Sequence, residues 1–351
     1  MQKIYVRPIS MSYGSDARKL IKSKQALPLC SNKNLAFGKI EIILRGNNNV
    51  IKTLNVNELK KLPAKIKKEV LKKIKNITKR RKKISGLNLD TFKIFGVLNV
   101  TPDSFSDGGK FNKLKKAISH SKEMISHGAD VIDVGGESTR PGAKLISIED
   151  EKKRVLQVIS KIKKFKVSID TRKSEVMFAA VKKGAKIIND VSAMDFDEQS
   201  LNVVAKLKKP IILNHSQGTP DVMQNNPKYQ NVLLDIYDYF EKKINQLTKR
   251  KFLKQNIILD PGIGFGKNLD HNLNLISNIG LFHSLGCPIM LGPSRKSFIG
   301  RVMKDKDSKD RLGGTLAAVI TGYNQGVQCF RVHDIKESYE ALKVQEALNS
   351  I

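Results

Sequence analysis

Six segments in the last three-quarters of the chain are apolar at first and then end in a polar side chain that could bind a small molecule. These polar residues are Asn99, Asp170, Asn189, Asp260, Lys296 and the pair Arg331 and His333. Acidic and amide groups at three of these ends, Asp170, Asn189 and Asp260, can accept hydrogen bonds from the N–H groups of a planar ligand. Together they could satisfy the edge of a heterocycle such as a pterin or a purine. For Asp170, capping of a following helix is the alternative.

The basic residues Arg331 and His333 are two positions apart, so an extended strand projects both side chains to the same face. With Asn99 they could hold a diphosphate together with Mg²⁺, because magnesium keeps several waters and is held partly by substrate phosphates. A purely structural histidine is the alternative for His333. No group of His, Cys and acidic residues in the sequence has the spacing of a metal site built by protein alone.

Two glycine-rich loops follow the first two of the apolar segments. Thr101–Gly109 is rich in hydroxyls and glycines and is predicted to be a lid over a ligand. Gly135–Gly142 carries Arg140, which could reach a phosphate. Two such loops in succession favour a substrate that must be enclosed.

The elements that must position these residues form a repeating pattern. Eight apolar runs occur at residues 92–100, 129–136, 166–171, 185–191, 210–216, 256–262, 288–294 and 327–334, typical of strands buried on both faces. Segments of helical period lie between them, such as Lys152–Lys164, Glu175–Lys183, Lys228–Lys251 and Asp310–Asn324. The pattern predicts an α/β fold, a parallel (β/α)8 TIM barrel over residues 91–351. An open doubly wound sheet is the alternative, but it would gather its ligands at one switch point.

Residues 1–90 differ in composition and are predicted to be a small basic α+β region. They contain 23 Lys/Arg and only 5 Asp/Glu, in a chain whose net charge is +31. We expect a hairpin over residues 35–56 and a lysine-rich helix over Glu58–Lys83, interrupted early by Pro63. Its apolar residues share one stripe and should pack on a neighbour: Leu59, Leu62, Ile66, Val70, Leu71, Ile74 and Ile77.

The basic balance could reflect attraction to the phosphates of nucleic acid, lipid or substrate. A compositional bias explains it more simply, because Lys, Asn and Ile are abundant along the whole chain. The basic helix has no aromatic residue that could stack on a base, which disfavours a nucleic-acid partner. The role of residues 1–90 stays unknown.

Three widely spaced cysteines, Cys30, Cys287 and Cys329, include no CxxC pair, which argues against a disulfide framework and fits a reducing compartment. The N-terminus does not read as an export signal, and no run of about 18 apolar residues occurs. We therefore expect a cytoplasmic protein that does not associate with a membrane.

Seven motifs in this order resemble those of the dihydropteroate synthases, and the resemblance covers residues 92–351. They are GVLNVTPDSFSDGG (96–109), GADVIDVGGESTRPGA (128–143), SIDTRKSEV (168–176), KIINDVSA (186–193), ILDPGIGFGKN (258–268), GPSRKSFIG (292–300) and RVHD (331–334). The resemblance implies a transferase of folate biosynthesis and a sulfonamide target. Its substrates would be 6-hydroxymethyl-7,8-dihydropterin diphosphate and p-aminobenzoate, which it joins to 7,8-dihydropteroate with release of diphosphate.

The resemblance also implies a role for each matching residue. Asp170, Asn189, Asp260 and Lys296 would contact the pterin, and Asp170 would stabilise a developing methylene cation. Asn99, Arg331 and His333 would form the diphosphate end, with Mg²⁺ as the cofactor and Asn99 as its ligand. Binding of p-aminobenzoate is implied for Thr139, Pro141, Phe265 and Ser297, next to Arg140. A homodimer is implied as well.

One departure from the family pattern lies at the end of the fifth strand, where Asn214 stands in a position that often holds methionine. Two other functions stay open at this point. A pterin-binding methyltransferase domain that acts with a corrinoid partner would share Asp170, Asn189 and Asp260, but not Ser294–Ser297 or the Thr101–Gly109 loop. The third possibility is a non-catalytic barrel tethered to nucleic acid or membrane by its basic region.

Overall fold

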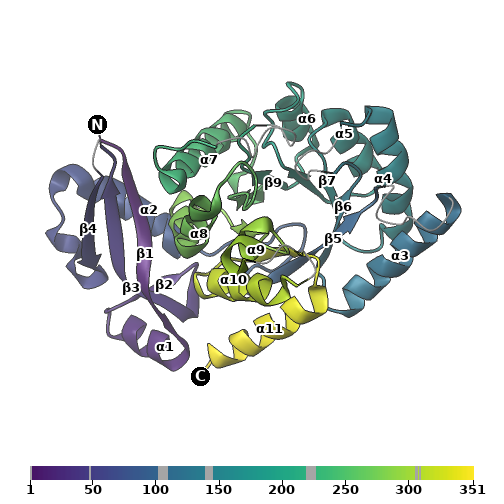
Figure 1. Cartoon of the computed structure of the whole chain (residues 1–351). Helices are drawn as coiled ribbons and strands as arrows, with labels where there is room; N and C mark the ends of the chain where they lie inside the picture. Colours follow the sequence, from purple (N-terminus) through teal and green to yellow (C-terminus); the bar gives the residue numbers. More distant parts are fainter. Residues whose placement is uncertain are drawn as a thin grey trace.

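The computed structural model describes residues 2–46, 49–101, 110–138, 145–218, 227–304, 307 and 310–351 (Figure 1). A parallel barrel forms its larger part. The eight strands are β5 (Lys93–Asn99), β6 (Val131–Gly135), β7 (Val167–Asp170), β8 (Ile187–Asp190), β9 (Ile211–Asn214), β10 (Ile257–Asp260), β11 (Met290–Leu291) and β12 (Cys329–Val332).

The strands pair in the order β10-β9-β8-β7-β6-β5-β12-β11, all in parallel. A parallel bridge between Leu259 and Ile289 joins β10 to the segment before β11 and so closes the ring. The TIM barrel expected from the sequence is therefore confirmed, and each strand lies inside the apolar run that predicted it.

Helices alternate with the strands and cover the outside of the barrel (Figure 1). They are α3 (Lys110–Ser126), α4 (Ile148–Ile162), α5 (Ser174–Lys183), α6 (Ser200–Leu207), α7 (Val232–Lys249), α8 (Leu269–Ser277), α9 (Ser297–Met303), α10 (Leu312–Asn324) and α11 (Ile335–Leu348). Side-chain caps fix where several of them begin: Ser147 accepts a hydrogen bond from the Asp150 amide in α4, and Asn231 accepts one from Leu234 in α7. Because the chain enters each helix just past a strand end, the polar strand ends gather at one face of the barrel.

Residues before the barrel fold into a four-stranded antiparallel sheet. It contains β1 (Ile4–Tyr13), β2 (Leu27–Leu29), β3 (Asn32–Leu44) and β4 (Val50–Asn55), with helices α1 (Gly14–Lys22) and α2 (Ala64–Thr78). The predicted hairpin is the antiparallel β3–β4 pair. The predicted basic helix over Glu58–Lys83 is divided at Pro63. The short 3-10 helix η1 (Val56–Lys61) precedes the proline, and α2 follows it and ends at Thr78.

The apolar stripe of α2 packs on this sheet as expected, with Val70, Ile74 and Ile77 buried. Leu71 is the exception, because 42% of it is exposed. It lies one residue past Val70, at the edge of the stripe, so it turns away from the sheet.

The sheet is not a free arm but packs on the barrel (Figure 1). Tyr5 of β1 is fully buried within the barrel's own apolar core and meets Tyr237 of α7 edge to face, with 5.0 Å between ring centroids. Ion pairs surround this contact, including Arg45 with Asp235 and Asp238, and Lys3 with Asp238. Apolar burial and charge pairing therefore join the two parts.

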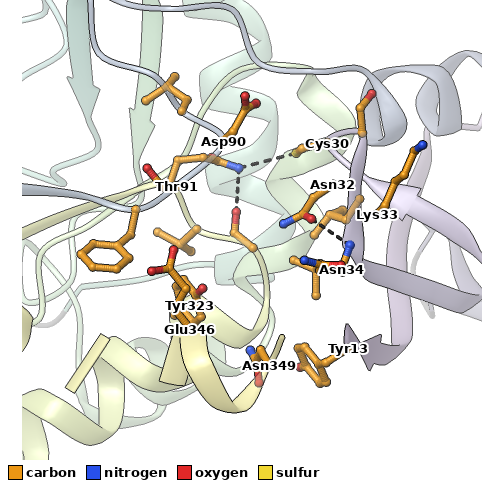
Figure 2. Close-up of a pocket in the computed structure, with 18 of the residues that line it drawn as sticks. Tyr13, Cys30, Asn32, Lys33, Asn34, Asp90, Thr91, Tyr323, Glu346 and Asn349 are labelled. Atoms are coloured by element: carbon orange, nitrogen blue, oxygen red, sulfur yellow. Dashed lines mark hydrogen bonds between the residues drawn. The ribbon is translucent and has the colours of Figure 1, made fainter. Parts of the chain in front are cut away.

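A hollow of about 470 Å³ opens between the sheet and the barrel (Figure 2). Its barrel side includes residues 89–92 and 327–328, which precede β5 and β12, so it lies at the amino ends of the strands. Several of its polar groups bond to one another, as Arg80 does with Asp90 and the Asn34 amide with Asn32 Oδ1. In a barrel of this kind the reactive face is the opposite one, at the carboxyl ends of the strands.

Candidate functional site

Side chains from consecutive strand ends converge on a small pocket in the mouth of the barrel. It is lined by Asp170, Asn189, Val191, Asn214, Asp260, Phe265, Gly292, Lys296 and Arg331. Six residues expected from the sequence are therefore brought together, from segments as distant as β7 and β12. Their own side chains leave about 10 Å³ free, room for roughly one water molecule. A ligand the size of a heterocycle must therefore move some of them.

Arg331 is the central cation of the mouth. Its Nη2 donates to Asp170 Oδ2 at 2.6 Å, and its Nε donates to Asp133 Oδ2, also at 2.6 Å. Burial lowers the pKa of Arg331, but Asp133 and Asp170 more than offset this and keep it above its ordinary value. The guanidinium therefore stays charged and is held between two acidic side chains.

The alternative reading of Asp170 as a helix cap is wrong. Helix α5 is capped instead by Asp197, whose Oδ2 accepts a hydrogen bond from the Ser174 amide at 2.7 Å. Asp170 turns into the mouth, where burial raises its pKa and Arg331 opposes the rise. Its carboxylate is thus available to a cationic or N–H-bearing ligand.

Asp133 was missed in the sequence, although it is the most buried acid of the mouth. It lies inside β6, with its side chain 0% exposed, and also accepts a hydrogen bond from Asn189 Nδ2 at 3.0 Å. Its Oδ1 has no partner among the described residues. A charged residue within the apolar run VIDVG was the available signal, since such a residue requires a partner.

Asp260 is held in part by its own loop, since the Gly262 amide donates to Oδ1 at 2.8 Å. Burial raises its pKa, and the nearest cation, Lys296, opposes the rise. Asp260 therefore closes a short turn at the end of β10. The second oxygen lies near Gly292 in the wall of the pocket.

Lys296 crosses the mouth from the strand β11 side to the loop after β10. Its Nζ donates to the carbonyl of Ile263 and lies 4.3 Å from the centre of the Phe265 ring. Burial lowers its pKa to about 8, although Asp260 acts in the opposite direction. A lysine with this pKa can bind an acceptor as a cation near neutral pH and lose its charge just above it.

The loop after β10 is shaped by glycine. Gly262 has φ +69°, and a Cβ atom there would lie 1.9 Å from the carbonyl oxygen of His215. Only glycine therefore allows this loop to cross so close to the end of β9. That crossing brings Phe265 to the mouth.

Lys267, a buried lysine that no sequence pattern predicted to be part of the site, secures the same loop. Lys267 is 1% exposed, and its Nζ contacts the carbonyl oxygen of Phe265 at 2.8 Å, that of His215 at 3.2 Å and His215 Nδ1 at 3.1 Å. Burial lowers the pKa of both Lys267 and His215 well below their ordinary values. The pair links the end of β9 to the loop that carries Phe265.

Three predicted residues lie at the edge of the mouth rather than in the pocket wall. The ring of His333 contacts Ser294 Oγ at 3.1 Å, is reached by solvent, and has its pKa lowered to about 4 by the packing around it and then by Arg331. Ser297 is exposed at the first position of α9. Asn99 lies beside Asp170 at Gly135. A Cβ atom on Gly135 would lie 3.5 Å from Asn99 Oδ1 and 3.6 Å from Asp170 Oδ2.

Thr139, Arg140 and Pro141 lie outside the described residues, as does most of the predicted lid over Thr101–Gly109. The segment that leads into the first group is well anchored. Glu137 binds both Arg172 and Lys173 at 2.9 Å, and all three side chains are buried. Lys173 also reaches Glu151 at 2.7 Å.

No group of three or more His, Cys or acidic residues that could hold a metal occurs in the described part of the chain. The Asn99 amide oxygen is a suitable single ligand for a hard cation held mainly by phosphate oxygens, because Mg²⁺ prefers oxygen donors. Within the same residues, no helix is long and apolar enough to cross a membrane.

Comparisons with known proteins agree on one family. The family model described as pterin binding enzyme matches residues 95–333. The dihydropteroate synthase of Escherichia coli strain K12 is 44% identical over 266 residues, which cover 75% of this chain and 94% of that one. That of Synechocystis is 40% identical over 258 residues, 73% of this chain and 89% of that one.

Solved structures give the same result. A Yersinia pestis dihydropteroate synthase in a sulfonamide drug complex superposes with a TM-score of 0.71 at 39% identity, over 76% of this chain and 97% of that one. A Xanthomonas albilineans dihydropteroate synthase with 4-aminobenzoic acid gives 0.72 at 36% identity, with the same coverage. The family match begins at Phe95, so the N-terminal sheet lies outside it.

Proposed function

This chain belongs to the dihydropteroate synthase family of pterin-binding enzymes, and on that basis we propose how its mouth residues divide the reaction. The protein is a transferase of folate biosynthesis. It condenses 6-hydroxymethyl-7,8-dihydropterin diphosphate with p-aminobenzoate to give 7,8-dihydropteroate and diphosphate.

The convergence of Asp170, Asn189, Asp260, Lys296 and Arg331 on one pocket is the observation that supports the assignment. Two acids and an amide offer acceptors to the N–H groups of the pterin ring, and Lys296 offers a donor to its acceptor atoms. In this proposal Lys296 leaves the Ile263 carbonyl when the ring enters. The ring then takes the space that the side chains now fill.

The diphosphate end is assigned to Arg331, His333 and Asn99. Arg331 has five N–H donors, and Asp133 and Asp170 engage only two of its nitrogens, which leaves donors for a phosphate oxygen. In the ligand-free enzyme, burial and then Arg331 lower the pKa of His333 to about 4, and in this proposal its ring donates a hydrogen bond to the diphosphate. Mg²⁺, held by Asn99 and the substrate, would neutralise charge on the diphosphate.

In the transfer itself, the bond between the exocyclic methylene carbon and the diphosphate oxygen breaks, and its electron pair leaves with the diphosphate. Positive charge develops on the methylene carbon, where the carboxylate of Asp170 stabilises it. The neutral amine of p-aminobenzoate then forms the C–N bond and afterwards loses one proton. Because the amine needs no prior deprotonation, this reaction requires no Ser–His or Cys–His pair.

The p-aminobenzoate side is assigned to Phe265 and Ser297 together with Thr139 and Pro141, while Arg140 is assigned to a substrate phosphate. Phe265 lines the pocket and stacks against Lys296, while Ser297 opens α9 at the rim. An aromatic face beside a cation suits a planar aromatic acid. In this proposal these residues hold the amine beside the pterin.

We also propose a homodimer in the cytoplasm. Exposed apolar side chains on the neighbouring helices α8 and α9, which include Leu273, Val302 and Met303, would be covered by a second copy. All three cysteines are free thiols, which suits a reducing compartment.

No observation favours the corrinoid methyltransferase alternative.

Diphosphate release by the purified full-length protein tests the function. Dihydropterin diphosphate, p-aminobenzoate and Mg²⁺ are supplied together, and each is then omitted in turn. The proposal predicts release only in the complete mixture. Folded protein that gives no turnover would contradict it, and methyl transfer that depends on a corrinoid would select the alternative.

A further inference from the structure

Asn214 is a buried amide that faces the mouth with an unused hydrogen-bonding atom. It is the last residue of β9 and only 6% exposed, and it lines the same pocket as Asp170 and Asp260. Its Oδ1 is buried and accepts no hydrogen bond from any residue that the structure describes. A buried amide oxygen without a partner is costly and is rarely retained unless something satisfies it.

The neighbouring strand ends show how unusual this is. Asp170 at the end of β7 is paired with Arg331, Asn189 of β8 with Asp133, and Asp260 of β10 with the Gly262 amide. Asn214 lies between the last two and is in register with Asp260. Of these four pocket-lining residues, only Asn214 has a fully buried side-chain oxygen without a hydrogen-bond partner within the described chain.

The loop after β10 does not supply the missing partner, although it passes directly over the amide. A Cβ atom on Gly262 would lie 2.7 Å from Asn214 Oδ1, so this glycine leaves room for the amide without offering it a hydrogen bond. Because Asn214 also lines the pocket, a ligand bound there would lie against its side chain.

We propose that Asn214 is a further specificity-determining contact to the pterin substrate, with its amide oxygen accepting a hydrogen bond from an N–H group of the ring. This inference rests on the proposed function. A pterin carries both an amino group and a ring N–H, and either could donate to the amide oxygen. A heterocycle in this pocket would lie against the ends of β7 to β10. An apolar side chain at the same position could pack on the ring but could not accept a hydrogen bond from its N–H groups.

Replacement of Asn214 by an apolar residue of similar size separates this role from a structural one. In Asn214→Leu the KM for dihydropterin diphosphate should rise about tenfold, the effect of one lost hydrogen bond, with kcat and the KM for p-aminobenzoate within twofold of wild type. The thermal midpoint of the ligand-free variant should stay equal or rise, because an unpaired buried amide has been removed. A structural asparagine would instead lower it.

Asn214→Met provides a second variant in case the leucine side chain disturbs the loop. The matched control is Leu213→Met, since Leu213 precedes Asn214 in the same strand and is buried in the core rather than at the mouth. The control should leave both KM values unchanged. An unchanged KM for dihydropterin diphosphate in both Asn214 variants, measured against an active wild type, would overturn the inference alone. An inactive wild type would overturn the proposed function instead.

Discussion

Arg331 and Asp170 form an ion pair with 2.6 Å between Nη2 and Oδ2, although they are 161 positions apart in the sequence. Both residues line the pocket in the barrel mouth, and a second acid, Asp133, accepts a hydrogen bond from Nε of the same guanidinium. In the proposed reaction, the cation assigned to the leaving group and the anion assigned to the reacting carbon are therefore held in direct contact. Substitution of either acid should separate their roles.

Asp170→Asn should reduce kcat by about 100-fold or more, because a neutral amide cannot stabilise the developing methylene cation. Steady-state diphosphate release measures the effect. Asp197→Asn is the matched control, since it changes an acid that caps α5 outside the mouth to another good capping residue. A kcat for Asp170→Asn within threefold of wild type would remove Asp170 from the reaction.

Asp133→Asn should act through Arg331 rather than on the substrate. The amide keeps the shape of the side chain but weakens its charge-assisted hydrogen bond, so kcat/KM for dihydropterin diphosphate should fall about tenfold. The KM for p-aminobenzoate should not change. If both KM values rose together, Asp133 would be supporting the barrel in general and not positioning Arg331.

The pH dependence should report Lys296, whose pKa is lowered to about 8 in the free enzyme. The lysine is charged below this pH and neutral above it, so kcat/KM for dihydropterin diphosphate should decline as the pH rises through about 8. Lys296→Met should lose this decline and most of the activity, while its circular dichroism spectrum stays that of the wild type. A mutant with the same pH profile as the wild type would contradict the assignment.

Position at a strand end made much of this site predictable. Asp170, Asn189, Asp260, Lys296 and Arg331 each follow an apolar run, and a closed parallel barrel brings such ends together whatever their distance in the chain. The sequence could not show which of them pair. Asp133 was missed because it lies within a strand, and its partner Arg331 is 198 residues away.

The contribution of local chemistry was harder to predict. His333 was expected to project with Arg331, but its ring lies on Ser294 at the rim because the chain bends after β12 ends at Val332. In the sequence, Lys267 could not be distinguished from the many surface lysines. It is buried because the glycine-rich loop after β10 crosses close to the end of β9. The packing of the N-terminal sheet on α7 depends on long-range contacts that no local pattern encodes.

Tyr5→Ala tests whether the N-terminal sheet and the barrel share one core. The ring is fully buried against Tyr237, so its removal should lower the free energy of unfolding by about 3–5 kcal/mol. Denaturant unfolding measures the change, and the transition should remain single. Ile51→Ala is the control, because Ile51 is 58% exposed in the same sheet and should cost less than about 0.5 kcal/mol. Equal stability of the two variants would mean that the interface contributes nothing.

The most direct test of the central claim follows the oxygen that bridges the methylene carbon and the first phosphorus. Dihydropterin diphosphate labelled with ¹⁸O at that atom is converted by the wild-type protein in the presence of p-aminobenzoate, and both products are analysed by mass spectrometry. Cleavage of the C–O bond at the mouth predicts one dihydropteroate for each diphosphate, with the label entirely in the diphosphate. Label retained in a hydroxymethylpterin, or diphosphate formed without dihydropteroate, would contradict the account.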